Sequence, residues 1–274
     1  MKTIDTELSF MKKRSAFLFF IFILFGCQSE DVVTTHEPKL DYYVDSYDIP
    51  DLGFQPSLKV TYEYNSSGKL SKSRVLSYNP DSKSFDELRH LDFTYSGNEV
   101  SKILGYLPDE LTPYMEQSYE YSQDGRVSKI KETNGSTGLK SEANFVYDDA
   151  HQSTKVFYTY SNGGSFEYEF NMSGGNVVTD KTTRGSQLCS DAKYTYDDRI
   201  NPFKDLGYTD YLLTNLSANN KLTEIANYIN CAFPSFIPES YSYEYDDRGY
   251  PTLITTFYKS AATLRKSQKE IFYK

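Results

Sequence analysis

Short stretches in which aromatic and polar positions alternate recur through most of the chain. In each of them an aromatic residue is followed by Glu, Thr or Val and then by a second aromatic residue. Alternation with a period of two places both aromatic side chains on one face of a strand and the residue between them on the other. The pattern therefore predicts half-buried antiparallel strands at seven places: Tyr62–Tyr64, Phe93–Tyr95, Tyr119–Tyr121, Phe145–Tyr147, Tyr168–Phe170, Tyr194–Tyr196 and Tyr243–Tyr245.

A turn follows most of these strands, and a second strand with its own signature follows the turn. The turns are rich in Gly, Asn and Asp, which supply the positive φ that tight hairpins need. A charged residue, Leu or Val, Ser and Lys then follow in the same order in three repeats: Gly68–Ser73, Asn98–Ile103 and Gly125–Ile130. The apolar positions Val127 and Ile130 are three residues apart, so either a bulge intervenes or both faces of the strand are partly covered.

The sixth repeat contains an insertion. Its aromatic strand starts 49 residues before the seventh, whereas the other intervals are 23 to 31 residues. The matching second strand is Asn220–Ile225, which leaves about residues 199–218 as the inserted segment. Asn201 can cap a helix there and Pro202 suits its first position, while Leu206 and its apolar neighbours supply a hydrophobic face. We expect two short helical turns that pack against the rim of the sheet.

These features predict an all-β domain over residues 58–274. We expect an antiparallel meander of about seven repeated hairpins that forms a curled sheet, with the short helical insertion in the sixth repeat and a terminal strand at Glu270–Tyr273. The order of Tyr-x-Tyr, turn glycine, basic residue, Leu or Val, Ser and Lys resembles the YD/RHS-type repeat, in the short lipoprotein form common in Bacteroidota. The resemblance covers residues 58–274. It implies an antiparallel sheet that curls on itself and no activity, because the function of that family is unknown.

Residues 1–26 have the pattern of a lipoprotein signal peptide. Basic residues at 12–14 precede an apolar run at 15–25 that is too short to span a bilayer, and a start at Met11 would give a more conventional signal than Met1. Leu24–Cys27 resembles the lipobox of bacterial lipoproteins, in which the cysteine is diacylated and becomes the mature N-terminus. The acidic residues that follow Cys27 resemble the export signal of Bacteroidota surface lipoproteins. We expect an outer-membrane protein that is lipid-anchored through Cys27 and exposed at the cell surface, the periplasmic face being the alternative.

Residues 27–57 are predicted to be an acidic tether between the lipid and the domain. The segment has seven acidic residues and one lysine, with Pro38, Pro50 and Pro56 spaced through it. The alternative is that Tyr42–Val44 and Ile49–Phe54 dock on the domain as an edge segment. The whole chain has 29 Lys and Arg against 38 Asp and Glu, a net charge of −9, which argues against a nucleic-acid partner.

The sequence lacks the common catalytic and metal-binding motifs. The three histidines, His36, His90 and His151, form no metal-ligand pair, and neither a nucleophile elbow nor a phosphate-binding loop is present. We therefore expect no enzyme activity, no metal and no cofactor. Three acidic pairs after the aromatic strands suit either calcium or turn hydrogen bonds, and we favour turns because no oxygen-rich loop of EF-hand spacing surrounds them: Asp148–Asp149, Asp197–Asp198 and Asp246–Asp247.

The two remaining cysteines are expected to form a disulfide. Lipidation of Cys27 leaves Cys189 and Cys231, and the envelope is an oxidising compartment. The alignment of the sixth repeat places the two nearly opposite each other at the open end of a hairpin, within disulfide reach. The alternative is a pair of buried free thiols.

Two functions suit such a lipoprotein. The first is a non-catalytic envelope-structural or protein-binding module. The second is glycan binding through exposed tyrosine faces, for which the tyrosines outside the repeat pattern are available: Tyr42, Tyr43, Tyr47, Tyr106 and Tyr114.

Overall fold

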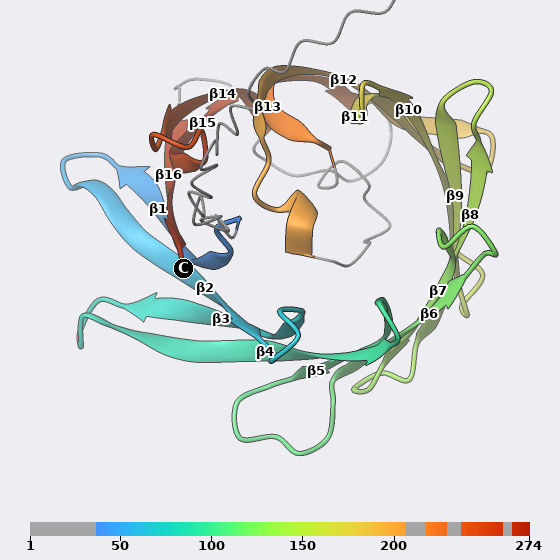
Figure 1. Cartoon of the computed structure of the whole chain (residues 1–274), viewed down its shortest axis with the longest axis horizontal. Coiled ribbons are helices and arrows are strands. Elements are labelled where there is room, and N and C mark those ends of the chain that lie inside the picture. The colour runs from blue at the N-terminus through green and yellow to red at the C-terminus, as the bar shows by residue number, and fades with distance from the viewer. Residues whose placement is uncertain (1–36, 207–216, 229–236, 260–264) are drawn as a thin grey trace, which may run out of the picture. The chain divides into compact units, whose positions relative to one another are not determined.

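Antiparallel strands that pair with their neighbours in sequence make up most of the protein (Figure 1). The computed structural model describes residues 37–206, 217–228, 237–259 and 265–274, and within them it contains sixteen strands and one 3₁₀ helix. The barrel that they form lies within residues 38–274, a unit distinct from residues 1–37. The elements are β1 (Leu40–Ile49), β2 (Gly53–Tyr64), β3 (Leu70–Asn79), β4 (Ser84–Ser96), β5 (Glu99–Tyr106), β6 (Met115–Tyr121), β7 (Val127–Asn134), β8 (Lys140–Asp148), β9 (Ser153–Tyr160), β10 (Ser165–Ser173), β11 (Asn176–Arg184), β12 (Gln187–Ile200), η1 (Lys204–Leu206), β13 (Asn219–Tyr228), β14 (Ile237–Tyr245), β15 (Pro251–Lys259) and β16 (Arg265–Tyr273).

The first strand pairs with the last and closes the sheet. β1 lies between β2 and β16, with Tyr43 opposite Val60 on one side and Ile271 on the other. Next to this ladder, Lys39 N donates to Lys274 O at 3.0 Å and Lys274 N donates to Lys39 O at 2.9 Å. The all-β antiparallel meander is confirmed, but the expected curled sheet of about seven hairpins is wrong. The strands form a closed barrel, in which every strand edge has a partner.

The barrel begins at Leu40, so the boundary expected between residues 57 and 58 is wrong. β1 and the start of β2 occupy much of the segment interpreted as an acidic tether, as the alternative of a docked segment anticipated. Acidic residues are compatible with a strand here because they find cations on neighbouring strands. Asp45 of β1, for example, lies 2.7 Å from Lys269 Nζ of β16.

A bulge explains the spacing of three between apolar residues in the second strand of the repeat. In the β6–β7 pair, Glu120 is opposite Lys129 and Tyr121 is opposite Val127, so Ser128 has no partner across the ladder. Because of this extra residue, the side chains of Val127 and Ile130 both point into the barrel although they are three residues apart, and both are 5% exposed. The sequence left a bulge and two-sided burial open, and the bulge is what the structure contains.

The same irregularity recurs along the barrel. The register shifts at the second aromatic position in most of the repeats: Glu63/Tyr64, Thr94/Tyr95, Glu120/Tyr121, Thr195/Tyr196 and Glu244/Tyr245. Ser71 Oγ and Ser101 Oγ, at the bulged positions of β3 and β5, donate to the carbonyls of Glu63 and Thr94 at 3.1 and 3.2 Å. The serine in the repeat signature therefore satisfies a backbone group beside the bulge.

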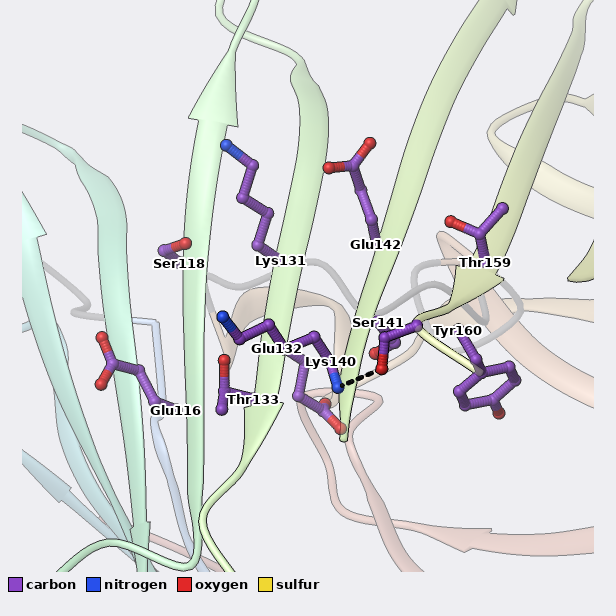
Figure 2. Close-up of a pocket in the computed structure, with 11 residues that line it drawn as sticks. Glu116, Ser118, Lys131, Glu132, Thr133, Lys140, Ser141, Glu142, Thr159 and Tyr160 are labelled. Atoms are coloured by element: carbon purple, nitrogen blue, oxygen red, sulfur yellow. Dashed lines mark hydrogen bonds between the residues drawn. The ribbon is translucent and has the colours of Figure 1, made fainter. Parts of the chain in front are cut away.

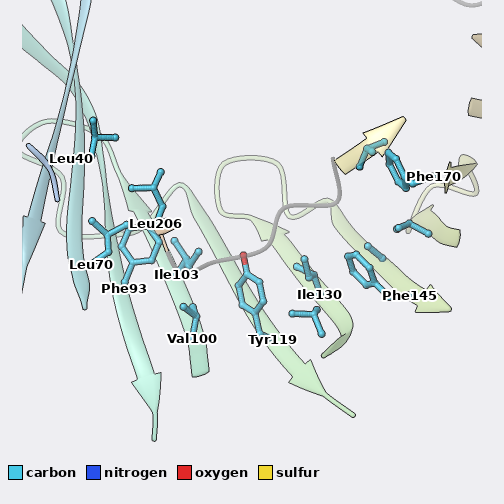
Figure 3. Packing of buried hydrophobic residues seen from close by; sticks show 14 of the residues in the cluster. Leu40, Leu70, Phe93, Val100, Ile103, Tyr119, Ile130, Phe145, Phe170 and Leu206 are labelled. Carbon is cyan, nitrogen blue, oxygen red and sulfur yellow. The ribbon is translucent and has the colours of Figure 1, made fainter. Parts of the chain in front are cut away.

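The apolar core lines the inner face of the barrel (Figure 3). η1 lies inside the ring of strands (Figure 1), and Phe203 beside it packs edge-on against Tyr43 of β1 with 5.8 Å between ring centroids. Leu206 of η1 belongs to one cluster with buried residues from around the wall, among them Leu70, Phe93, Ile103, Tyr119, Ile130, Phe145, Phe170 and Ile271. A barrel of sixteen strands is too wide for its wall side chains to fill. Phe203 and Leu206 help to fill it.

The inserted segment is less helical than expected. β12 continues to Ile200, and the only helix in the described part of the insertion is the three-residue η1. Asn201 forms a turn before η1, in which its Oδ1 accepts from Phe203 N at 3.1 Å, while its Nδ2 donates to Ser217 O at 2.9 Å. The expected pair of helical turns is wrong for these residues, and residues 207–216 lie outside the described part. Among the described residues no helix has the length and apolar character needed to cross a membrane.

Candidate functional site

In seven strand pairs a tyrosine hydroxyl joins the end of an even-numbered strand to the start of the strand before it. Each donates to a backbone carbonyl: Tyr64 to Leu40 (2.9 Å), Tyr95 to Leu70 (2.9 Å), Tyr121 to Val100 (2.8 Å), Tyr147 to Val127 (2.8 Å), Tyr196 to Val177 (2.6 Å), Tyr243 to Lys221 (2.6 Å) and Tyr273 to Pro251 (2.8 Å). Burial raises the pKa of Tyr121 and of Tyr147 to about 12. We call this set the tyrosine ladder. It gives seven of the 26 tyrosines a structural role in the wall.

A charged cluster occupies the inner face on β11–β14. Asp180 is opposite the buried residues Phe170 and Ala192, and Tyr194 OH donates a short hydrogen bond to its carboxylate. Burial raises the pKa of the Asp180 carboxyl and that of Tyr194.

A lysine and a glutamate complete this inner cluster. Lys221 Nζ lies 3.0 Å from Glu224 Oε2, and Tyr241 OH donates to the same oxygen at 3.2 Å. The Lys221 ammonium also lies over the ring of Tyr194, 4.5 Å from its centroid. Each of these half-buried groups is therefore held by an oppositely charged or hydrogen-bonding neighbour.

A second inner cation lies across the cavity on β16. Lys269 Nζ is 2.7 Å from Asp45 Oδ1 and 3.3 Å from the ring centroid of Tyr43. Burial lowers the pKa of Lys269, although the pair with Asp45 opposes that effect. Cation–π contact with Tyr43 further favours the charged form of the amine.

A cavity of about 200 Å³ separates these two lysines. Lys221 and Lys269 line it together with Tyr241, Tyr243 and Asn220. The cavity offers amide groups and aromatic faces, and both of its cations already have carboxylate partners. Within the described ranges no three His, Cys, Asp or Glu side chains are grouped as a metal site requires.

The outer face of the wall is ion-paired across neighbouring strands. The pairs are Lys72–Asp92 (3.0 Å), Lys102–Glu116 (2.7 Å), Lys129–Glu142 (3.0 Å), Lys131–Glu120 (2.5 Å) and Lys155–Glu167 (2.9 Å). Figure 2 shows part of this face across β6–β9, where a shallow groove of about 480 Å³ includes Ser118, Lys131, Glu142 and Thr159. Each of these four residues neighbours a buried residue in its strand, so alternation places them on the outside.

The residues that the sequence singled out have different fates. Cys189 on β12 is fully buried, whereas Cys27 and Cys231 lie outside the described residues, so lipidation and the disulfide stay predictions. His36 is also outside this part of the chain. His90 stacks on Tyr106 with 5.2 Å between centroids.

The acidic pairs make the hydrogen bonds of turns. Asp148 accepts from His151 N at 3.1 Å, and Asp246 accepts from Arg248 N at 3.0 Å and Tyr250 N at 2.9 Å. Hydrogen bonds from the ring and backbone of His151 lower the pKa of Asp148. Burial opposes a similar shift at Asp246, but hydrogen bonds from Tyr250 N and from Arg248 lower its pKa overall. These contacts agree with the turn interpretation.

Sequence reasoning missed the inner charged residues. A signal was available, since in a strand segment without a bulge a charged residue two positions from an inward aromatic or aliphatic residue faces inward as well. Asp45 stands two residues after Tyr43, and Lys269 stands two residues before Ile271.

Comparisons with known proteins show a similarity of fold and no similarity of sequence beyond it. No family model and no curated protein matches the sequence, so the resemblance to YD/RHS repeats stays a prediction. A porin-like protein from Bacteroides uniformis has a similar structure at 11% identity, with a TM-score of 0.56 over 86% of this chain and 98% of that chain. A porin-like protein from Bacteroides vulgatus is similar at 14% identity, with a TM-score of 0.50 over 87% of this chain and 99% of that chain. The barrel is therefore shared with Bacteroides proteins described as porin-like.

Proposed function

We propose that the protein is a lipid-anchored envelope module whose barrel stands in water and binds a protein partner without catalysis. The observation that carries the proposal is the polarity of the wall, which is aromatic inside and ion-paired outside. Membrane-spanning barrels have the reverse arrangement, with an apolar outward band and a polar interior. The similarity to proteins described as porin-like then concerns the fold of the wall and not its surroundings.

Energetics support an aqueous setting for the outer face. A Lys or Arg facing lipid costs about 2–4 kcal/mol at the bilayer midplane. Lys102, Lys129 and Lys155 all lie inside strands of the outer wall, so lipid contact would add several such penalties. Water solvates these groups at no comparable cost. The membrane link in this proposal is the lipid on Cys27.

Binding is favoured over catalysis because the charged inner groups are engaged in the wall. Lys221 is paired with Glu224, and Asp180 accepts a hydrogen bond from Tyr194. Lys269 is paired with Asp45. Groups fixed in this way contribute to stability and specificity of the wall.

Glycan binding through exposed tyrosine faces has less support. Tyr42 stacks on Phe272 at 4.3 Å between centroids, and the Lys59 ammonium lies 3.9 Å from the same ring. Tyr106 stacks on His90. Faces covered in this way are not free to stack on sugar rings.

The test compares the full-length protein with Cys27→Ala in cells that process lipoproteins. We expect the wild type to incorporate a palmitate analogue and to sediment with outer membranes. The variant should lack the label and be released without detergent, folded as judged by far-UV circular dichroism. A Cys27→Ala protein that stays in the membrane fraction until detergent is added would show that the wall itself contacts lipid, and the proposal would be lost.

A further inference from the structure

The barrel has two rims, and they differ in chemistry. The chain enters the barrel at Pro38–Leu40 and ends at Lys274 on one rim, which we call the entry rim. The opposite rim carries the turns between β1 and β2, between β3 and β4, and between β5 and β6. We call these three turns the acidic rim and define them as residues 47–54, 79–86 and 107–113.

The acidic rim exposes large apolar side chains. Leu52 is 67% exposed and Leu111 is 96% exposed, and Ile49, Phe54 and Leu107 are exposed beside them. Burying an apolar side chain of this size is worth about 1.5–3 kcal/mol, so exposure of several in the first and third of these hairpins needs an explanation. Grouped apolar residues on a polar background mark interaction surfaces.

Turn formation does not require these apolar residues. The next turns on the same side of the barrel are built from small polar residues, as at 135–138 (Gly-Ser-Thr-Gly), 161–164 (Ser-Asn-Gly-Gly) and 185–186 (Gly-Ser). On the entry rim, the turn at 65–68 (Asn-Ser-Ser-Gly) is also polar. Among the described turns of this rim, the exposed large apolar side chains therefore lie in the hairpins at 47–54 and 107–113, and the hairpin at 79–86 between them has none.

The same three hairpins carry a strong negative charge. Their acidic residues are Asp48, Asp51, Asp81, Asp86, Asp109 and Glu110, and Lys83 is their single basic residue. Each hairpin has a Pro-Asp pair at its turn: Pro50–Asp51, Pro80–Asp81 and Pro108–Asp109. Carboxylates around apolar side chains complement a surface that places lysines or arginines around apolar pockets.

Local contacts hold the first and third of these turns in fixed shapes. Leu52 N donates to Ile49 O at 3.1 Å, and Gln55 Nε2 donates to Leu52 O at 2.8 Å. In the third turn Glu110 N donates to Leu107 O at 3.2 Å. Turns that are ordered before binding lose less conformational entropy when a partner docks.

We propose that the acidic rim docks an envelope protein whose contact surface has apolar pockets bordered by lysine and arginine. The inference rests on the proposed function in that it takes the protein to be a binding module, and it names the surface and the chemistry of the partner. A second copy of this chain would bring acidic rim against acidic rim, and an anionic membrane surface would repel it in the same way. The chain enters the barrel at the entry rim, so the partner binds at the opposite end of the barrel.

Site-specific photo-crosslinking in intact cells tests the proposal on the full-length protein. A photoreactive phenylalanine replaces Leu52 or Leu111 in turn, with Ser66 on the entry rim and Val146 on the outer wall as control positions. We expect one and the same adduct from Leu52 and Leu111, at least about tenfold stronger than from Ser66 or Val146. Mass spectrometry of the adduct should identify a partner peptide with apolar residues next to Lys or Arg.

A charge variant tests the electrostatic part. Asp51→Asn, Asp81→Asn and Asp109→Asn are combined, because Asn tolerates the left-handed backbone of Asp51 (φ 66°) and Asp109 (φ 61°). Asp198→Asn with Asp247→Asn on the entry rim is the control. We expect the rim variant to reduce the Leu52 adduct at least fivefold and the control to leave it unchanged, both with wild-type circular dichroism.

Several outcomes would overturn the inference. They are an adduct with a second copy or with lipid, an adduct whose partner peptide is acidic, and equal labelling at all four positions. A yield of the Leu52 adduct that is unchanged in the charge variant would overturn it as well. A specific adduct from Val146 alone would reject the acidic rim and leave the proposed binding function standing. Absence of adducts at every position would reject both, whereas the Cys27→Ala fractionation can fail without affecting the crosslinks.

Discussion

Removal of one hydroxyl from the tyrosine ladder should destabilise the barrel measurably. Tyr121 OH donates to Val100 O at 2.8 Å, and Val100 is 1% exposed. Tyr121→Phe keeps the ring and its packing and deletes the donor alone. The carbonyl of Val100 then loses one hydrogen-bond partner in a place that water does not reach.

The magnitude follows from the energetics of unsatisfied buried groups. Loss of a partner for a buried acceptor costs about 1–3 kcal/mol, and a carbonyl that can keep its other lone pair engaged lies at the lower end, about 1–2 kcal/mol. With a urea m-value of about 3 kcal/mol/M for a domain of this size, the midpoint falls by about 0.3–0.7 M. Tyr95→Phe and Tyr147→Phe remove equivalent bonds in neighbouring repeats. The triple variant should lose roughly 3–6 kcal/mol if the sites are additive.

The assay is urea unfolding followed by far-UV circular dichroism, on protein that carries Cys27→Ala so that lipid does not interfere. Tyr42→Phe is the matched control, because its ring stacks on Phe272 on the outer face and lies outside the ladder. The control should change the free energy of unfolding by less than about 0.5 kcal/mol, as surface substitutions do. If Tyr121→Phe and Tyr42→Phe have the same effect, the ladder is not a source of stability and the reasoning is refuted.

Three further predictions concern other parts of the barrel. Lys269→Met leaves the Asp45 carboxylate without its cation on the inner face and should lower the free energy of unfolding by roughly 2–3 kcal/mol, somewhat less than for a fully buried pair. The double variant Lys269→Met with Asp45→Asn should recover most of that loss in a double-mutant cycle. The folded-state pKa of Tyr121 is raised from 10 to about 12, so its contribution to stability is complete below pH 10 and is lost as the pH rises from 10 through 12. In Tyr121→Phe the free energy of unfolding should therefore fall less steeply with pH in this range, and an unchanged slope would count against the raised pKa of Tyr121. Mass spectrometry of a non-reduced digest should show Cys189 joined to Cys231, and alkylation of both thiols in folded protein would exclude the bridge.

The repeat was readable from the sequence because its determinants are local. Aromatic alternation, turn residues and the serine at the bulge all act within one hairpin, and neighbouring strands pair with each other as expected. The closure was not readable, because it depends on pairing between β1 and β16, more than 220 residues apart in sequence. Composition was misleading here. The acidic side chains within 40–57 suggested a solvated tether, but Asp41 and Asp45 pair with Lys274 and Lys269 near the C-terminus.

The sixth repeat shows a second limit. Alignment of its signature placed Leu222 where Leu70 stands in the first repeat, opposite the second aromatic residue. In the structure Tyr196 is opposite Lys221, and Leu222 takes the bulged position. An inward lysine is stable at that place because Glu224 lies 3.0 Å away, a contact that pattern matching on apolar residues cannot anticipate.

Alternation with a period of two determines which residues share a face, but it does not by itself assign that face to the inside or the outside of a closed barrel. A membrane-spanning barrel and this barrel have the same period and opposite polarity. The residues that decide between them are those beside the inward aromatics. Glu120 next to Tyr119 pairs with Lys131 on the adjacent strand, and Glu142 next to Ala143 pairs with Lys129. Such cross-strand ion pairs favour water on the outer face, and this is the reason why we propose a barrel that is held at the membrane by a lipid and is not embedded in it.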